Sequence, residues 1–205
     1  MAHSVARGVR TYGPRAAIVD CDATAVLQLA GALQNTGMFA EIAPAEMSVL
    51  VIWDAHRSID DLQGVLETVD ISGAAPVGRD IEIPTVYDGE DLADVAAIAG
   101  CSIADVIAMH SQTTYLAAFA GFAPGFMYCT GLPDALVVPR RDTPRTRVPK
   151  GSVAVADRYT AVYPIDSPGG WNLIGRTDME LFDLHAADPA AIRPGDRVRF
   201  VARNT

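Results

Sequence analysis

Four arginines gather in one short stretch of this chain, and arginine side chains bind anions. The stretch PRRDTPRTRVPKGSV (139–153) carries Arg140, Arg141, Arg145 and Arg147. Arg145 and Arg147 alternate along PRTRVP, so in an extended strand their side chains would point to the same face. Two guanidinium groups on one face, with Lys150 close by, would hold a carboxylate, a carboxyphosphate or a phosphate. The alternative is that these arginines are solvated and pair with local acids such as Asp142.

The charge distribution along the chain favours a local anion site. The 205 residues carry a formal net charge of -9, which argues against general nucleic-acid binding because such binding needs a basic surface. Residues 80–139 contain eight acids and no Lys or Arg, whereas residues 140–158 contain six basic residues and two acids. Positive charge therefore gathers in one Gly- and Pro-rich segment of an acidic protein.

Two further side chains, His110 and Cys129, could take part in proton transfer or nucleophilic attack. His110 ends a predicted helix, where a histidine is either a general acid or base or simply a residue that the helix dipole favours. Cys129 lies beside Tyr128 in a glycine-rich stretch, so a nucleophilic thiol is one interpretation. The commoner interpretation of such a cysteine is a small thiol buried in the core.

The stretch SPGGWNLIGRT (167–177) places Trp171 directly after two glycines. An aromatic ring displayed on such a turn either stacks on a planar ligand or fills the end of a barrel. Ser152 follows Lys150 and Gly151, but this order of residues is not that of a Walker A loop. The patterns GxSxG, HExxH and GxGxxG are missing, and the three cysteines show no CxxC spacing. We therefore expect no metal site and no complete catalytic set within this chain.

The elements that would position these residues fall into two parts. Strands at 15–19, 39–43 and 47–53 with helices at 22–35 and 59–69 predict a small α+β domain over residues 1–78, with two helices on an antiparallel sheet. Residues 72–80 have the composition of a linker. A strand at 81–87, two short helices at 91–110 and then β segments broken by Gly and Pro predict a barrel or sandwich over residues 79–205. With no apolar run of membrane-span length and no signal-peptide pattern, we expect a cytoplasmic protein without membrane contact.

Three long motifs give a resemblance to a known family. They are HSQTTYLAAFAGFAPGFMYCTGL (110–132), PRRDTPRTRVPKGSVAVA (139–156) and YPIDSPGGWNLIGRTDMELFD (163–183). In these motifs the chain resembles the family of allophanate hydrolase subunit one, which includes KipI and the PxpB component of the bacterial three-component 5-oxoprolinase. The resemblance covers essentially the whole chain. It implies an α+β N-terminal domain followed by a cyclophilin-like β-barrel domain.

The resemblance also implies a function, that of a subunit in a heteromeric, ATP-dependent 5-oxoprolinase that opens 5-oxoproline to glutamate. The implied partners are subunit two of the family pair (PxpC) and a third subunit, with ATP used by the complex and this chain inactive alone. In such a site we expect His110 to shuttle a proton, Arg145 and Arg147 to hold a carboxylate or a phosphorylated intermediate, and Trp171 to cover the substrate. The other candidate substrate-binding residues match family-pattern positions and are Tyr128, Arg140, Ser152 and Arg176.

Two alternatives stay open at the level of sequence. A regulatory protein resembling KipI would use the same surface to inhibit a histidine kinase and would catalyse nothing. A component of a urea- or allophanate-type amidolyase would act on a different amide. Cys129, Lys150 and Tyr159 depart from the family's pattern, so no inherited role is assigned to them.

Overall fold

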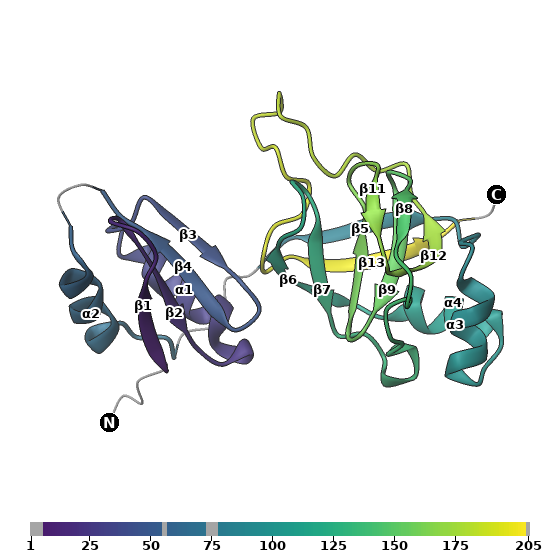
Figure 1. Cartoon of the computed structure of the whole chain (residues 1–205), viewed down its shortest axis with the longest axis horizontal. Helices are drawn as coiled ribbons and strands as arrows, with labels where there is room; N and C mark the ends of the chain where they lie inside the picture. Colours follow the sequence, from purple (N-terminus) through teal and green to yellow (C-terminus); the bar gives the residue numbers. More distant parts are fainter. Residues whose placement is uncertain (1–5, 55–56, 73–77, 204–205) are drawn as a thin grey trace. The chain divides into compact units, whose positions relative to one another are not determined.

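The chain folds into two compact units, Met1–Val77 and Gly78–Thr205, which Figure 1 shows in a computed structural model. The structure describes residues 6–54, 57–72 and 78–203. Among these residues, no single helix is long and apolar enough to cross a membrane. The helix pair Leu92–Ala99 and Ile103–Gln112 passes that test only by length and composition, and the chain bends by 92° between the two.

The first unit is a four-stranded antiparallel sheet with two helices. Its elements are β1 (Gly8–Thr11), β2 (Ala16–Asp20), the 3-10 turn η1 (Ala23–Ala25), α1 (Val26–Asn35), β3 (Glu41–Pro44), β4 (Ser48–Ile52) and α2 (Ile59–Thr68). The strand order is β1-β2-β4-β3. Leu29 and Leu33 of α1 and Leu62 of α2 are buried in one core with the inward-facing residues of β2 and β4. Strand β1 pairs with β2 along its whole length and has no counterpart among the predicted strands.

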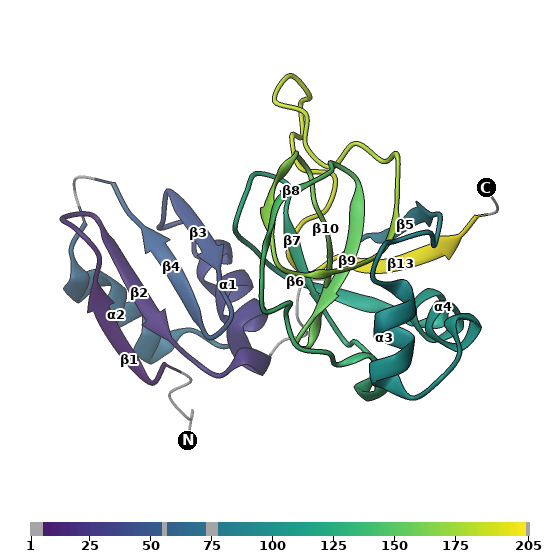
Figure 2. The same cartoon turned by 45° about the vertical axis from the view of Figure 1, so that its right-hand side comes forward.

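The second unit is built on a seven-stranded sheet that curves into a nearly closed barrel (Figure 2). Its strands are β5 (Asp80–Thr85), β6 (Tyr115–Ala120), β7 (Met127–Thr130), β9 (Ser152–Ala156), β10 (Tyr159–Val162), β12 (Asn172–Arg176) and β13 (Arg197–Ala202). The order is β12-β9-β10-β7-β6-β13-β5, and only β13 and β5 run parallel. Val86 and Arg176 join the two outer strands, with N···O distances of 2.9 and 2.8 Å between their main chains. Since an edge strand leaves its polar groups unpaired, this bridge protects both edges.

Short elements complete the second unit around this barrel. They are α3 (Leu92–Ala99), α4 (Ile103–Gln112), the 3-10 turn η2 (Asp134–Leu136) and the two-stranded pair of β8 (Arg145–Val148) and β11 (Ser167–Gly169). Helix α3 ends at Gly100, whose left-handed conformation a residue with a side chain would adopt only at a cost. Helix α4 begins at Ser102, which forms a capping box with Asp105. Both helices bury apolar residues in the barrel core.

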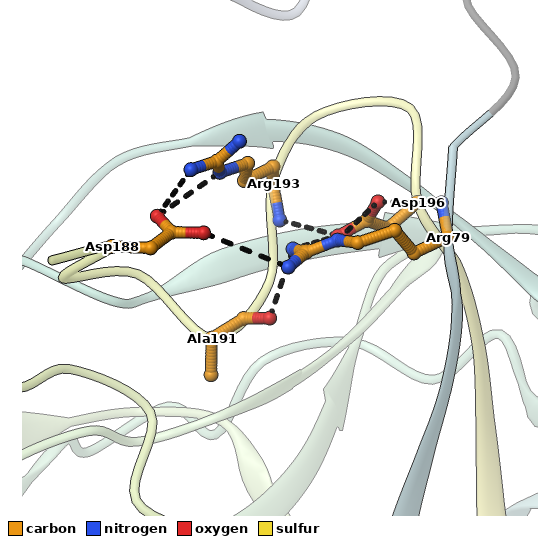
Figure 3. A network of polar contacts seen from close by, with 5 residues as sticks. All are labelled: Arg79, Asp188, Ala191, Arg193 and Asp196. Atoms are coloured by element: carbon orange, nitrogen blue, oxygen red, sulfur yellow. Dashed lines mark hydrogen bonds and ion pairs between the residues drawn. The ribbon is translucent and has the colours of Figure 1, made fainter. Parts of the chain in front are cut away.

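A polar network fixes the parallel pair that closes the sheet (Figure 3). The buried carboxylate of Asp196, in the turn before β13, accepts hydrogen bonds from the side chain and main chain of Arg79 and from the main chain of Arg193. Arg79 also donates to the carbonyl oxygen of Ala191 at 3.1 Å and lies 3.7 Å from Asp188. Because a buried carboxylate is stable only when its oxygens are satisfied, this network holds the first residue pair of β5 and β13 in register.

Candidate functional site

The barrel unit carries a pocket of about 280 Å³, and half of the residues that line it are aromatic. It is lined by Phe122, Phe126, Tyr128, Arg140, Pro144, Tyr163, Pro168, Gly169, Gly170 and Trp171. These residues come from β7, from the turn before it, from the segment before β8, and from the segment between β10 and β12. The pocket thus lies within the part of the sequence that is richest in Gly, Pro, Arg and aromatic residues.

Edge-to-face contacts set the orientation of the rings. The ring of Phe126, which is 2% exposed, lies 5.4 Å from that of Tyr163 and 5.5 Å from that of Trp171. Tyr128 contacts Trp171 at 5.5 Å in the same way. This geometry brings the positive edge of one ring to the negative face of another, so the walls are held in place before any ligand binds.

Phe122 differs from the other aromatic residues because it is 60% exposed and its main chain is strained. Its φ of 66° lies in the left-handed region, which a bulky residue adopts only when its surroundings require it. Its ring contacts Phe126 at 5.1 Å and Tyr163 at 6.0 Å. An exposed aromatic ring at the edge of a pocket, held at a cost, points to contact with a ligand or a partner.

Arg140 supplies the positive charge of the pocket. Among the residues that the structure describes, Arg140 forms no ion pair or hydrogen bond, although most of the other arginines have a carboxylate partner. Burial raises the pKa of the Tyr163 hydroxyl, which a hydrogen bond from the main chain of Trp171 and the charge of Arg140 partly oppose. The pocket therefore presents one free guanidinium group beside a protonated phenol.

The expected anion site of Arg145 and Arg147 is not formed in this structure. Arg145 lies 2.7 Å from the buried carboxylate of Asp91 and 3.3 Å from Glu90, and these hydrogen bonds and charges raise the pKa of its guanidinium. Arg147 pairs instead with Asp166 at 2.6 Å and is 76% exposed. The two side chains thus bind different acids of the same chain, and both charges are already compensated.

Three other charged or polar candidates also lie outside the pocket. Lys150 pairs with Glu180 at 2.7 Å. Arg176 pairs with Asp88 at 2.8 Å and lines a separate hollow of about 640 Å³. Ser152 is buried, and its hydroxyl donates to the carbonyl oxygen of Pro149 at 2.7 Å within a turn. None of these three side chains lines the pocket.

His110 is a core residue and not part of the pocket. Burial lowers the pKa of its imidazole to about 3, so the ring is neutral at physiological pH. Its role as a proton carrier stays an untested prediction, and its burial argues against it, because a shuttle has to reach the substrate. The thiol of Cys129 is likewise buried, and its pKa is raised to about 12, which keeps it protonated and unreactive.

Of the eight predicted site residues, the structure thus brings together three in the pocket: Tyr128, Arg140 and Trp171. The sequence reasoning missed Phe122, Phe126 and Tyr163, although all three lie in the Gly- and Pro-rich stretches GFAPGF and YPIDSPGG. No group of three or more His, Cys, Asp or Glu side chains that would hold a metal occurs among the described residues. The arrangement is suited to binding a small acid with a flat or apolar body.

The chain that carries this pocket has a carboxyltransferase fold. Its likeness to the crystal structure of the Kluyveromyces lactis urea carboxylase has a TM-score of 0.69 at 15% identity and covers 98% of this chain and 23% of that one. The structure of TTHA0988 is similar with a TM-score of 0.81 at 35% identity, over 93% of this chain and 40% of that one.

Sequence comparison identifies the family within the proteins of this carboxyltransferase fold. The model of the carboxyltransferase domain, subdomain C and D, matches residues 8–192. The B component of 5-oxoprolinase from Escherichia coli O157:H7 is 50% identical over 129 residues, 62% of this chain and 59% of the relative. That of Haemophilus influenzae is 40% identical over 169 residues, 81% of this chain and 72% of the relative. The chain belongs to the carboxyltransferase subdomain C and D family, within the group of 5-oxoprolinase B components. The match to the Escherichia coli relative spans 59% of that protein's length, which is less than two thirds.

Proposed function

We propose that this chain is a subunit of a heteromeric, ATP-dependent 5-oxoprolinase, which opens the cyclic amide of 5-oxoproline to give glutamate. The names of its relatives support this proposal at the level of the family. The structural observation that supports the proposal is the guanidinium of Arg140, which has no ion pair among the described residues, at an aromatic pocket of about 280 Å³.

The pocket and the proposed substrate have matching chemistry. 5-Oxoproline is a five-membered lactam ring with one carboxylate. Arg140 would hold that carboxylate through charge-assisted hydrogen bonds, which are shorter and stronger than neutral ones. Tyr128 and Trp171 would pack against the ring, and the exposed ring of Phe122 would cover it. A pocket of this size suits a small molecule.

The pocket offers binding groups but no nucleophile and no titrating base, since His110 and Cys129 are buried elsewhere in the unit. Hydrolysis of an unstrained amide at neutral pH needs activation of its carbonyl group. We therefore propose that ATP and the remaining catalytic groups are held by the complex, through a subunit two of the PxpC type and a third subunit. In this proposal the chain alone binds substrate and turns nothing over.

The test is reconstitution of the complex. The chain is co-expressed with subunit two and the third subunit, and ATP hydrolysis is measured with and without 5-oxoproline. We expect hydrolysis that depends on 5-oxoproline and on all components, with glutamate formed in equal amount. Stimulation by urea or allophanate in place of 5-oxoproline would instead favour an amidolyase component. Loss of all stimulation, with capture of a histidine kinase by the chain, would favour a regulatory protein.

A further inference from the structure

We propose that Asp91 is a positioning residue for the Arg140 pocket. It does not line the pocket, but it binds both of the segments that supply the pocket's charged and indole walls. This inference rests on the proposed function, because it concerns how that same pocket recognises a carboxylate.

Asp91 lies between β5 and α3, at the N-cap position directly before the helix, and is 2% exposed. One carboxylate oxygen, Oδ1, accepts from Arg141 Nη1 at 2.5 Å and from Arg145 Nη2 at 2.7 Å. The other, Oδ2, accepts from the main-chain N–H of Leu173 at 2.7 Å. The main-chain N–H of Asp91 donates in return to the carbonyl oxygen of Leu173 at 2.9 Å. A single buried side chain thus connects two segments that lie more than twenty residues apart in sequence.

The first of these segments carries the charge of the pocket. Arg141 and Arg145 are the direct neighbours in sequence of Arg140 and Pro144, which line the pocket. By binding both, Asp91 fixes the segment at its two ends. An arginine side chain has several rotatable bonds and therefore many conformations. A fixed main chain at Arg140 limits the positions that its guanidinium group can take.

The second segment carries the indole wall. Leu173, whose main-chain N–H and carbonyl oxygen both bond to Asp91, follows Trp171 by two residues. Further contacts join the two segments directly. The main-chain N–H of Arg141 donates to the carbonyl oxygen of Gly170 at 2.8 Å, and the amide of Asn172 donates to that of Pro139 at 2.9 Å. Movement at Asp91 would therefore reach both walls of the pocket.

The charge of Asp91 has a second consequence, which is to keep Arg140 as the free cation of the cluster. Arg141 and Arg145 share the Asp91 carboxylate, and the only other acid that pairs with them in the described part of the chain is Glu90, which is 73% exposed. Removing the buried negative charge would leave Arg141 without a carboxylate partner in the described part of the chain and Arg145 with the exposed Glu90 alone. They would then repel Arg140 and compete with it for the carboxylate of a ligand.

The experiment uses the fluorescence of Trp171 in the full chain. The sequence has two tryptophans, and Trp53→Phe leaves Trp171 as the only reporter. In this background Asp91→Asn keeps the shape of the side chain and an acceptor for Leu173 but removes the charge. The matched control is Asp94→Asn, an exposed aspartate in the first turn of the same helix. Each protein is titrated with 5-oxoproline and with 2-pyrrolidinone, the same lactam without the carboxylate.

Because Asp91→Asn keeps an acceptor for Leu173, the indole wall should stay in place, and the lost charge should act on the arginine segment alone. We therefore expect the variant to weaken the binding of 5-oxoproline about tenfold, the size of a lost charged interaction, and that of 2-pyrrolidinone less than about twofold. Asp94→Asn should change neither. Equal weakening of both ligands would mean that Asp91 supports the fold only, and unchanged binding would mean that it does not act on the pocket, so each result overturns the inference. If neither ligand changes the fluorescence of the parent protein, the pocket itself is misassigned and the proposed function loses its structural support.

A second variant covers the case in which Asp91→Asn fails to fold. Arg141→Gln removes one guanidinium, whose side chain is 36% exposed, and leaves Asp91 bound to Arg145 and Leu173. We expect it to fold and to bind 5-oxoproline about threefold more weakly, with 2-pyrrolidinone unaffected. Unchanged binding of 5-oxoproline by this variant would contradict the proposal that the contacts of Asp91 position the pocket.

Discussion

The phenol oxygen of Tyr87 lies 2.8 Å from Nδ1 of His110 within the barrel core. On the other side of the ring, Thr160 Oγ1 lies 2.8 Å from Nε2 and donates its own proton to the carbonyl oxygen of Ala154. The threonine therefore accepts from Nε2–H, which leaves Nδ1 to accept from the tyrosine. Both nitrogens are satisfied within the protein, and the neutral imidazole ties α4 to the sheet.

This arrangement predicts a pH dependence of stability. Burial lowers the pKa of His110 from 6.5 to about 3, so between these values the unfolded chain binds a proton that the folded chain does not. The contribution of His110 is therefore complete above pH 6.5 and is lost as the pH falls toward 3. Relative to His110→Gln, the free energy of unfolding should fall by about 2 kcal/mol more between pH 7 and pH 5, at about 1.4 kcal/mol per pKa unit. Urea unfolding at both pH values measures the difference.

The matched control is His185→Gln, because His185 is exposed. It should leave the slope of stability against pH as in the parent protein. If His110→Gln and the parent lost stability in parallel over this range, the imidazole would have to be protonated within the fold, against the geometry of its hydrogen bonds.

Arg145 and Arg147, two residues apart on β8, should respond differently to removal. Arg145→Ala takes a cation from the buried carboxylate of Asp91 and should cost about 2 kcal/mol of unfolding free energy, the size of a hydrogen bond to a charged group. Arg147→Ala breaks an exposed pair with Asp166 and should cause no change beyond the error of measurement. Thermal or urea unfolding of both variants measures the two changes in unfolding free energy. Equal changes would contradict the assignment of Arg145 to a structural role.

These two arginines also show what local sequence can and cannot predict. Their alternation correctly suggested an extended segment, and both do lie on β8. Their partners, however, are set by tertiary structure. Asp91 lies 54 residues before Arg145, and Asp166 lies 19 residues after Arg147. A periodic pattern gives the direction of a side chain but not the carboxylate that meets it.

Local composition indicated the part of the chain that forms the pocket. For Trp171 in SPGGWN it left open whether the ring stacks on a ligand or fills the end of a barrel; the residue is 7% exposed, packs in a core cluster with Phe126 and Tyr163, and also lines the pocket. The position of His110 at a helix end gave no information on its burial, which is complete. Phe122 gave no signal, since its strain comes from a main-chain conformation that the sequence alone does not predict for a phenylalanine.

Two neighbouring glycines of the pocket should differ sharply in their tolerance of a methyl group. A Cβ at Gly169 would lie 2.3 Å from the hydroxyl oxygen of Tyr163, whereas a Cβ at Gly170 would meet nothing closer than 3.6 Å. Gly169→Ala should therefore cost about 1–3 kcal/mol, as overpacking does, and displace the ring of Tyr163. Gly170→Ala should stay within about 0.5 kcal/mol of the parent. Urea unfolding tests both, and a well-tolerated Gly169→Ala would show that Tyr163 is free to move.

Cys129 should be unreactive in the folded protein. Its thiol is buried and its pKa is raised to about 12, so little thiolate forms at pH 8. A thiol reagent should modify Cys101, which is partly exposed, well before Cys129. Mass spectrometry of the peptides after brief alkylation shows which of the two cysteines is modified first. Rapid labelling of Cys129 without unfolding would restore the nucleophile hypothesis for this residue.

Arg140 should affect substrate binding without affecting stability. It forms no ion pair or hydrogen bond among the described residues, so Arg140→Gln removes a charge from the pocket without breaking a polar contact of the fold. In the reconstituted complex the KM for 5-oxoproline should rise about 10- to 100-fold, the range that corresponds to one charge-assisted hydrogen bond, with a smaller change in kcat. The melting temperature should stay within about 1 °C of the parent's, as for a surface substitution. Arg158→Gln, another exposed arginine, serves as the matched control and should change neither value. A normal KM for Arg140→Gln would mean that the carboxylate binds elsewhere, because no other guanidinium lines this pocket.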